Sequence, residues 1–188
     1  MVTKEGFPIA YEIFKGNTFE GHTMILAIKS LIQRNKARAF TVVADAAMIS
    51  ADNIKELIQS DIYYIVGARM DNLSGELLEI VDKQIDRHDG KNIRIETELG
   101  YLICSYSSAR YCKDLYEINK QIEKAKQAVE SPSKTKKLKF IKTNKQKLEL
   151  NEDLIKKTKK LLGIKGYYTN LEEKKVSNKT VIRIVFTK

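Results

Sequence analysis

The sequence predicts an α/β fold in which helices flank a mixed sheet. Strand-like and helix-like segments alternate along the first seventy residues, and two of the strands, 39–45 and 61–67, are nearly continuous apolar runs. Runs of this kind, rich in β-branched residues, are typical of strands buried on both faces. The helical spacing of apolar residues between them gives a strand–helix–strand order, which indicates helices packed on a sheet.

The other elements of the first seventy residues follow in order. Residues 7–14 alternate between apolar and polar side chains and predict a further strand, and residues 23–35 repeat apolar residues at helical spacing. Ser50 is a typical N-cap for a short helix over 51–60. The strand over 7–14 is therefore expected to share a sheet with the two apolar strands, with both helices packed against it.

The next hundred residues have a different character. Residues 71–90 are polar and contain Gly75 and the turn His88-Asp89-Gly90. The elements expected after them are a strand over 92–104, a long helix over about 108–130, an exposed lysine-rich hairpin or loop over 134–147, and a short helix over 152–162. A return strand over 163–170 and the start of a last helix at 177–182 complete the chain.

This order predicts three parts along the sequence. Residues 1–69 form the N-terminal part of an α/β core, residues 70–162 are an inserted α+β segment, and residues 163–188 bring the return strand and the start of the last core helix. An insertion of about ninety residues is compatible with one domain.

Composition narrows the class of protein. The chain has 188 residues and two cysteines, Cys104 and Cys112, too few for a disulfide framework. It contains no apolar run long enough to cross a bilayer, and its start lacks the pattern of a secretory signal. We expect a reduced, cytoplasmic protein with no membrane partner.

The positive charge favours a polyanionic partner, and DNA is the commonest one. The formal net charge is +10 and the isoelectric point is near 9.4. The candidate phosphate contacts are Lys136, Lys137, Lys139 and Lys142, which lie in the lysine-rich segment. Because lysine is abundant throughout, a solvated insertion explains the same residues equally well, and both interpretations stay open.

Asp45 is the leading candidate for chemistry. It ends the strand 39–45, and ligands and metals gather at the carboxyl edge of the sheet in open α/β folds. A single carboxylate does not hold Mg²⁺ well, so a metal site requires partners. On the residues alone, a carboxylate that caps the turn toward Ser50 is the favoured interpretation.

Several blocks of residues carry a resemblance to a known family. In chain order they are Gly6-Phe7-Pro8-Ile9, Tyr11-Glu12-Ile13-Phe14-x-Gly16-Asn17-Thr18-x-Glu20-x-x-Thr23, Val42-Val43-Ala44-Asp45, Tyr64-Ile65-Val66-Gly67-x-Arg69, Tyr106-Ser107-Ser108-Ala109-Arg110-x-x-x-Asp114 and Gly163-Ile164-Lys165-Gly166-Tyr167-Tyr168-Thr169-Asn170-Leu171. Together they resemble bacterial insertion-sequence DDE transposases, in the superfamily that carries an insertion before the last catalytic residue.

The resemblance implies a fold and a mechanism. It implies a ribonuclease-H-like core in which two aspartates and a glutamate hold two Mg²⁺ or Mn²⁺ ions that cleave DNA and transfer its strands. Asp45 matches the second aspartate and is, by that match, a catalytic residue and metal ligand. The resemblance further implies duplex DNA as the partner and allows a dimer in the intact family.

Two departures from the family pattern limit what this chain is expected to do. The strand of the first aspartate would precede Gly6, where only Met1 to Glu5 stand, and the glutamate motif Tyr-x-x-Arg-x-x-x-Glu does not follow residues 177–182. Glu172 and Glu173 are better explained as a solvated charge cluster. We therefore expect a fragment, truncated at both ends, with its last helix cut after Ile182.

Such a fragment is expected to be catalytically inactive and poorly stable, because sheet edge and apolar face would lack cover. The alternative is a non-catalytic basic module that binds DNA or protein through the lysine-rich segment. A third interpretation is an unstable gene remnant without function.

Overall fold

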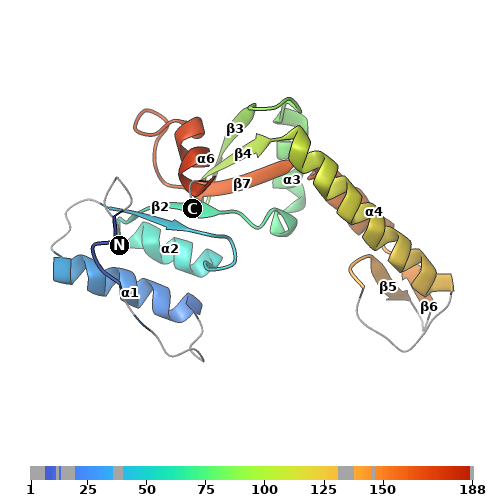
Figure 1. Ribbon diagram of the computed structural model, residues 1–188, viewed down its shortest axis with the longest axis horizontal. Coiled ribbons are helices and arrows are strands. Elements are labelled where there is room, and N and C mark those ends of the chain that lie inside the picture. Colours follow the sequence, from blue (N-terminus) through green and yellow to red (C-terminus); the bar gives the residue numbers. More distant parts are fainter. Residues whose placement is uncertain are drawn as a thin grey trace. The chain divides into compact units, whose positions relative to one another are not determined.

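The computed structural model describes residues 7–11, 13, 20–35, 40–130, 138–144 and 147–186 (Figure 1). The helices are α1 (Glu20–Asn35), α2 (Ala51–Gln59), α3 (Gly75–Gln84), α4 (Ser108–Glu130), α5 (Glu152–Lys160) and α6 (Asn178–Phe186), with a 3-10 turn η1 (Met70–Asn72). The strands are β1 (Thr41–Ala44), β2 (Tyr63–Gly67), β3 (Asn92–Thr97), β4 (Gly100–Tyr106), β5 (Ile141–Asn144), β6 (Lys147–Leu150) and β7 (Ile164–Thr169).

Five strands form a mixed sheet in the order β1-β2-β7-β4-β3, and β5 pairs with β6 in a separate hairpin. β1 and β2 are parallel, whereas β2 and β7 are antiparallel. These pairings confirm an α/β fold with a mixed sheet and flanking helices. No helix among the described residues is long and apolar enough to cross a membrane.

The chain divides into two compact units. Unit 1 consists of residues 1–69, 94–103 and 167–188, and unit 2 consists of residues 70–93 and 104–166. Residues 94–103 thus belong to unit 1 although they lie inside the segment expected to be inserted. Unit 1 is therefore assembled from three stretches of chain and unit 2 from two.

The core of unit 1 has two apolar layers because successive side chains of a strand point to opposite faces. Tyr64 and Val66 of β2 pack with residues of α1 and α2, such as Ile25 and Leu57. Ile65, between them, packs on the other face with Val181 of α6 and its neighbours. Both faces of β2 are therefore covered, which explains why its sequence is apolar throughout.

Hydrogen bonds from the end of β7 fasten it to β2. The Thr169 hydroxyl donates to the Tyr64 carbonyl at 2.6 Å, and the Asn170 amide accepts from the Tyr64 N–H at 3.1 Å. The Asn170 amide nitrogen donates to the Ile62 carbonyl at 2.9 Å. The Asn170 side chain thus replaces one step of a backbone ladder and extends the pairing beyond the strand.

Gly100, at the start of β4, lies close to both Thr169 and Tyr64. Its φ is +80°, and a Cβ there would lie 2.5 Å from the Thr169 carbonyl oxygen and 2.7 Å from the Tyr64 hydroxyl. Only glycine meets both conditions. The Tyr64 hydroxyl donates to the Leu99 carbonyl at 2.7 Å, and burial raises the pKa of Tyr64 to about 12.

Arg94 of β3 anchors the chain around α6. Its guanidinium donates to the Asn178 side chain at 2.9 Å, to the Leu171 carbonyl at 2.9 Å and to the Val176 carbonyl at 3.3 Å. It also lies 4.9 Å from the centre of the Tyr101 ring. One charged side chain therefore holds both the loop before α6 and the first residue of that helix.

Unit 2 has its own core along one side of α4. Ile118 and Ala125 of α4 pack with Phe140, with Ile155 of α5 and with Leu162. The N-terminus of α4 is capped from a distant loop: the Asp89 carboxylate accepts from the Ser108 N–H at 2.6 Å and from its hydroxyl at 2.5 Å. These hydrogen bonds lower the pKa of Asp89.

Several expected elements are confirmed with small changes in their bounds. Ser50 caps α2 through its hydroxyl, which accepts from the Asn53 N–H at 3.2 Å. The long helix is found over Ser108–Glu130. A hairpin is found, but it lies later than expected over 134–147: β5 falls within the lysine-rich segment, whereas β6 begins at its last residue, Lys147. The expected strand 39–45 is β1, Thr41–Ala44.

The strand expected over 7–14 is not found. The described residues 7–11 and 13 are irregular apart from an isolated bridge at Pro8. Ile9 is 55% exposed and Ile13 82% exposed. Alternation predicts which side chains share a face, but a strand also needs a paired neighbour along its length. Glu12 and Phe14 lie outside the described residues.

The structure differs from the expected elements at two places within residues 71–104. Residues 71–90 contain a helix, α3, whose N-cap Ser74 accepts from the Leu77 N–H at 3.2 Å and which buries Leu78 and Val81. The strand expected over 92–104 is a hairpin, because the chain turns at Glu98 and Leu99 into Gly100. The alternation of side chains continues across this tight turn, so the pattern alone does not indicate where the strand ends.

The last helix is also longer than expected. α6 runs over Asn178–Phe186, so the helix does not end at Ile182. It contacts β2 and buries Val181 completely. One face of the sheet therefore has a helical cover that was not expected from the sequence.

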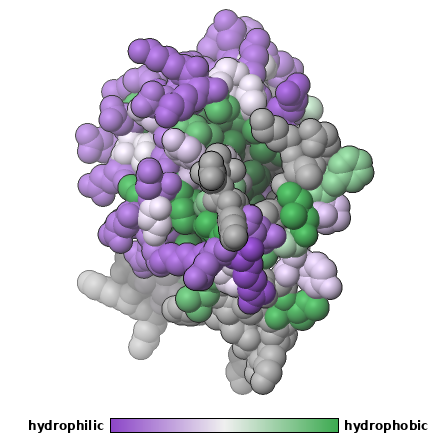
Figure 2. All heavy atoms as spheres, turned by 90° about the vertical axis from the view of Figure 1, so that its left-hand side faces the viewer, coloured by the Kyte–Doolittle hydropathy of each residue, from purple (hydrophilic) through white to green (hydrophobic). Residues whose placement is uncertain are grey.

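Apolar side chains remain exposed elsewhere in unit 1. Besides the N-terminal segment, Leu26 of α1 is 67% exposed and Met48 46% exposed. Figure 2 shows hydrophobic side chains among hydrophilic ones on the face that it draws. Contiguous exposed apolar surface promotes association, and the poor stability expected of the chain alone stays a prediction.

Replacing Arg94 by methionine tests the anchor of α6. Met keeps the apolar stem but removes three donors, so it should lower the free energy of unfolding of unit 1 by about 2–4 kcal/mol and speed amide exchange in α6. Arg87→Met is the control, because Arg87 pairs with Asp82 on the surface of unit 2. Equal exchange rates of α6 in the two variants would contradict the anchor.

Candidate functional site

Asp45 follows β1 at the carboxyl end of the parallel pair β1–β2. The register pairs Ala44 with Val66, so Asp45 stands beside the last residue of β2, Gly67. Its side chain is exposed. The sequence therefore placed Asp45 correctly, at an edge where open α/β sheets collect ligands.

The turn after Asp45 is held by Arg69, the second residue after β2. The Asp45 carbonyl accepts from the Met48 N–H at 3.1 Å, which closes the turn. Arg69 donates from Nε to the Ala46 carbonyl at 2.8 Å and from Nη2 to the Ala47 carbonyl at 3.2 Å. Arg69 thus fixes the backbone on which the Asp45 side chain stands.

Gly67 allows this turn to approach β2. A Cβ at Gly67 would lie 2.7 Å from the Ala46 nitrogen and 3.3 Å from its Cα. Those atoms are backbone and cannot rotate away, so a larger residue would push the turn outward. Sequence reasoning assigned no role to Gly67 or Arg69, although both stand in a block that carries the family resemblance.

The Asp45 carboxylate is not used for capping. Ser50 caps α2 with its own hydroxyl, and the turn is closed by the Asp45 main chain. Within the residues that the structure describes, the carboxylate makes no hydrogen bond or ion pair. As far as the described residues go, both Asp45 oxygens are therefore open to a ligand from solvent.

Asp45 alone does not make a metal centre. Among the described residues, no group of three His, Cys, Asp or Glu side chains lies close enough to hold a metal ion. Mg²⁺ and Ca²⁺ take about six or more oxygen ligands, and catalytic sites draw several of them from protein. Glu172 and Glu173 are exposed on a turn, and His88 pairs with the Asp86 carboxylate.

The four candidate lysines differ in their surroundings. Lys136 and Lys137 lie outside the described residues. Lys139 pairs with Asp71 at 3.1 Å and lies 5.7 Å from the centre of the Phe140 ring. Lys142 is exposed on β5, opposite Glu149 of β6. Lys139 therefore has a structural partner already, and Lys142 is more open to a phosphate.

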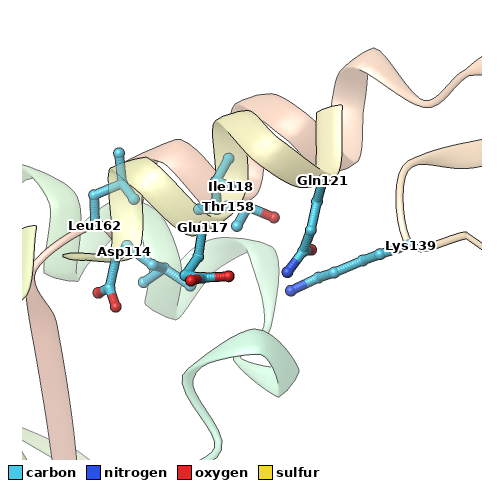
Figure 3. A pocket seen from close by; sticks show the side chains of 8 residues that line it. Asp114, Glu117, Ile118, Gln121, Lys139, Thr158 and Leu162 are labelled. Carbon is cyan, nitrogen blue, oxygen red and sulfur yellow. The ribbon is translucent and has the colours of Figure 1, made fainter. Parts of the chain in front are cut away.

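Figure 3 shows a cavity of about 180 Å³ in unit 2, between α4 and the end of α5. Asp114 lines it, accepts from the Gly163 N–H at 3.2 Å and lies 3.3 Å from the Arg110 Nε. Glu117, Gln121 and Lys139 also face it. The Asp114 contact ties α4 to the start of β7, which explains its place in the family blocks by structure.

Comparison with known proteins gives one match. A family model described as the transposase DDE domain matches residues 1–185. No curated protein and no solved structure matches the chain significantly.

Gly67→Ala tests the support of Asp45. The added Cβ meets the Ala46 backbone, so the variant should lose about 1–3 kcal/mol of stability and shift the amide resonances of residues 45–48. Gly75→Ala is the control, because nothing lies within 4 Å of a Cβ there. If Gly67→Ala leaves both stability and these resonances unchanged, the close approach is not required.

Proposed function

The chain belongs to the family of transposase DDE domains, and from this we infer that Asp45 occupies a metal-ligand position of a DNA-transposing enzyme. The family is generally dependent on divalent metal and acts on DNA. The observation that supports Asp45 is its place at the carboxyl end of a parallel strand, with both carboxylate oxygens open. Gly67 and Arg69 act as positioning residues for that carboxylate.

We further propose that the described part of unit 1 is a partial ribonuclease-H-like core. The parallel pair β1–β2, its crossover helix α2 and the covering helix α6 support this proposal. In this proposal residues 70–162 interrupt the core and residues 163–188 return to it.

We propose that this chain binds DNA without cleaving it. A DDE centre needs three acidic positions around two Mg²⁺ or Mn²⁺ ions, and Asp45 is the one acidic position that the family resemblance assigns here. Phosphoryl transfer in such centres depends on metal positioning and electrostatic stabilisation. One exposed carboxylate supplies neither, so no chemical step is assigned to this chain alone.

A second candidate function is a non-catalytic basic module for DNA or protein. The observation that favours it is the lysine-rich segment, because residues 134–147 contain seven lysines and no acidic residue. The two candidates differ in what Asp45 does. The transposase proposal makes Asp45 one ligand of a metal site that this chain does not complete by itself, whereas the module gives Asp45 no role.

Titration with Mn²⁺ tests whether this chain completes a metal site. We expect calorimetry of the whole chain to show no tight site, and Asp45→Ala to give the same trace. Stoichiometric binding that disappears in Asp45→Ala would mean that other groups of the chain converge on Asp45. The inactive interpretation would then be wrong, and cleavage of a labelled duplex in Mn²⁺ would be the next measurement.

DNA binding is expected to be weak, independent of base sequence and steeply dependent on salt. Replacing Lys136, Lys137, Lys139 and Lys142 by alanine should flatten the slope of log affinity against log salt by about 0.9 for each phosphate that is no longer neutralised. Lys139 should contribute least, because Asp71 already holds it. Fluorescence anisotropy with two unrelated duplexes measures this.

Asp45→Ala is the control for that titration and should leave the slope unchanged. A tenfold preference for one duplex that persists in high salt would contradict sequence-independent binding, since lysine reads phosphates and not base edges.

A further inference from the structure

One side of α4 carries a ridge of basic and aromatic side chains. α4 has 23 residues, and its buried side is marked by Ile118 and Ala125. A helix repeats every 3.6 residues, so positions three and four apart share a face. Four of the exposed residues on the side away from the core, which we call the outer ridge, are Lys113, Tyr116, Lys120 and Lys124; Glu123 and Gln127 are exposed on the same side.

Tyr116 is a large aromatic residue with an exposed side chain. Its side chain is 65% exposed, and the Lys120 ammonium lies 6.0 Å from the centre of its ring. Tyrosine combines an apolar ring with a hydroxyl and is enriched where proteins meet partners. Its position between Lys113 and Lys120 gives the outer ridge an aromatic centre with positive charge on both sides.

The charge of the outer ridge is not neutralised within the described part of unit 2. Lys160 pairs with Glu79, and Lys126 pairs with Glu123 at 2.8 Å. The lysines of the outer ridge take part in no ion pair among the described residues. Two acids neighbour the ridge lysines by helical spacing: Glu123, three residues after Lys120, pairs with Lys126, and Glu117, four residues after Lys113, lines the cavity in Figure 3.

The length of the outer ridge suits a DNA duplex. Lys113 and Lys124 are eleven positions apart, which at 1.5 Å per residue is about 16 Å along the helix. The major groove of B-DNA is about 12 Å wide between its phosphate backbones. The two end lysines can therefore reach phosphates on opposite sides of one groove while Tyr116 faces the space between them.

We propose that the outer ridge of α4 is a docking surface for the backbone of duplex DNA. Lys113, Lys120 and Lys124 neutralise phosphates, and the Tyr116 ring and hydroxyl contact the duplex between them. This inference rests on the proposed DNA-related function but is separate from the lysine-rich segment and from Asp45. The proposal assigns the DNA contact to one face of α4.

The test compares two triple variants with equal loss of charge. Lys113→Ala, Lys120→Ala and Lys124→Ala are combined in one chain, and Lys55→Ala, Lys83→Ala and Lys159→Ala in the control. All six lysines are exposed on helices, and alanine is a good helix former. Circular dichroism checks that both variants keep the helical content of the parent.

The ridge variant should bind a 20-base-pair duplex at least about tenfold more weakly at low salt, and its salt slope should fall by up to about 2.7, or 0.9 for each contact. The control should change affinity by less than about threefold. Equal losses of affinity in the two variants would contradict the proposal that DNA docks on the outer ridge. DNA binding would then depend on overall charge alone. A parent chain that binds no duplex at any salt would overturn both proposals.

A spectroscopic variant gives an independent readout. The chain has no tryptophan, so Tyr116→Trp introduces a single reporter on the outer ridge, and Tyr11→Trp introduces one on an exposed site of unit 1. DNA should quench or shift the emission of the Tyr116→Trp chain and leave that of Tyr11→Trp unchanged. The same response in both, or none in Tyr116→Trp while anisotropy reports binding, would contradict the docking surface.

Discussion

Unit 1 is held at its centre by the pairing of β2 with β7. β2 has β1 on one side and β7 on the other, and both of its faces are buried. Thr169 and Asn170 extend the pairing with side-chain hydrogen bonds to Tyr64 and Ile62. β1 pairs only with β2 among the described strands, so the place of Asp45 depends on β2, and the place of β2 depends on residues a hundred positions away.

Local signals explain which elements could be predicted. Ser50 predicts α2 because its hydroxyl suits an N-cap, and the apolar stripe of α4, from Cys112 to Val129, spans about five turns. The failures arise where the period is ambiguous or conceals a turn. α3 begins at Gly75, a residue that ordinarily indicates a loop, and the alternation of β3 continues through Gly100 into β4. The described residues 7–11 and 13 alternate in sequence but form no strand, apart from the isolated bridge at Pro8.

The candidate site shows the same division between local and distant causes. Asp45 could be found because a carboxylate after a β-branched strand is a local pattern. The residues that position Asp45, Gly67 and Arg69, could not be found in this way. They contact the turn across a strand pair, and nothing beside them in the chain indicates that contact. Gly67, Arg69 and Asp114 all stand in the family blocks and all make structural contacts here, Asp114 by accepting from the Gly163 N–H.

The three-part composition of unit 1 has a consequence for how the protein is made. Thr169 lies 105 residues after its partner Tyr64, and ribosomes add about 5–20 residues per second. For about 5–20 s after β2 leaves the ribosome, its second edge has no strand to pair with. Unpaired strand edges associate with other chains. During synthesis β2 is therefore open to association with other chains until β7 emerges.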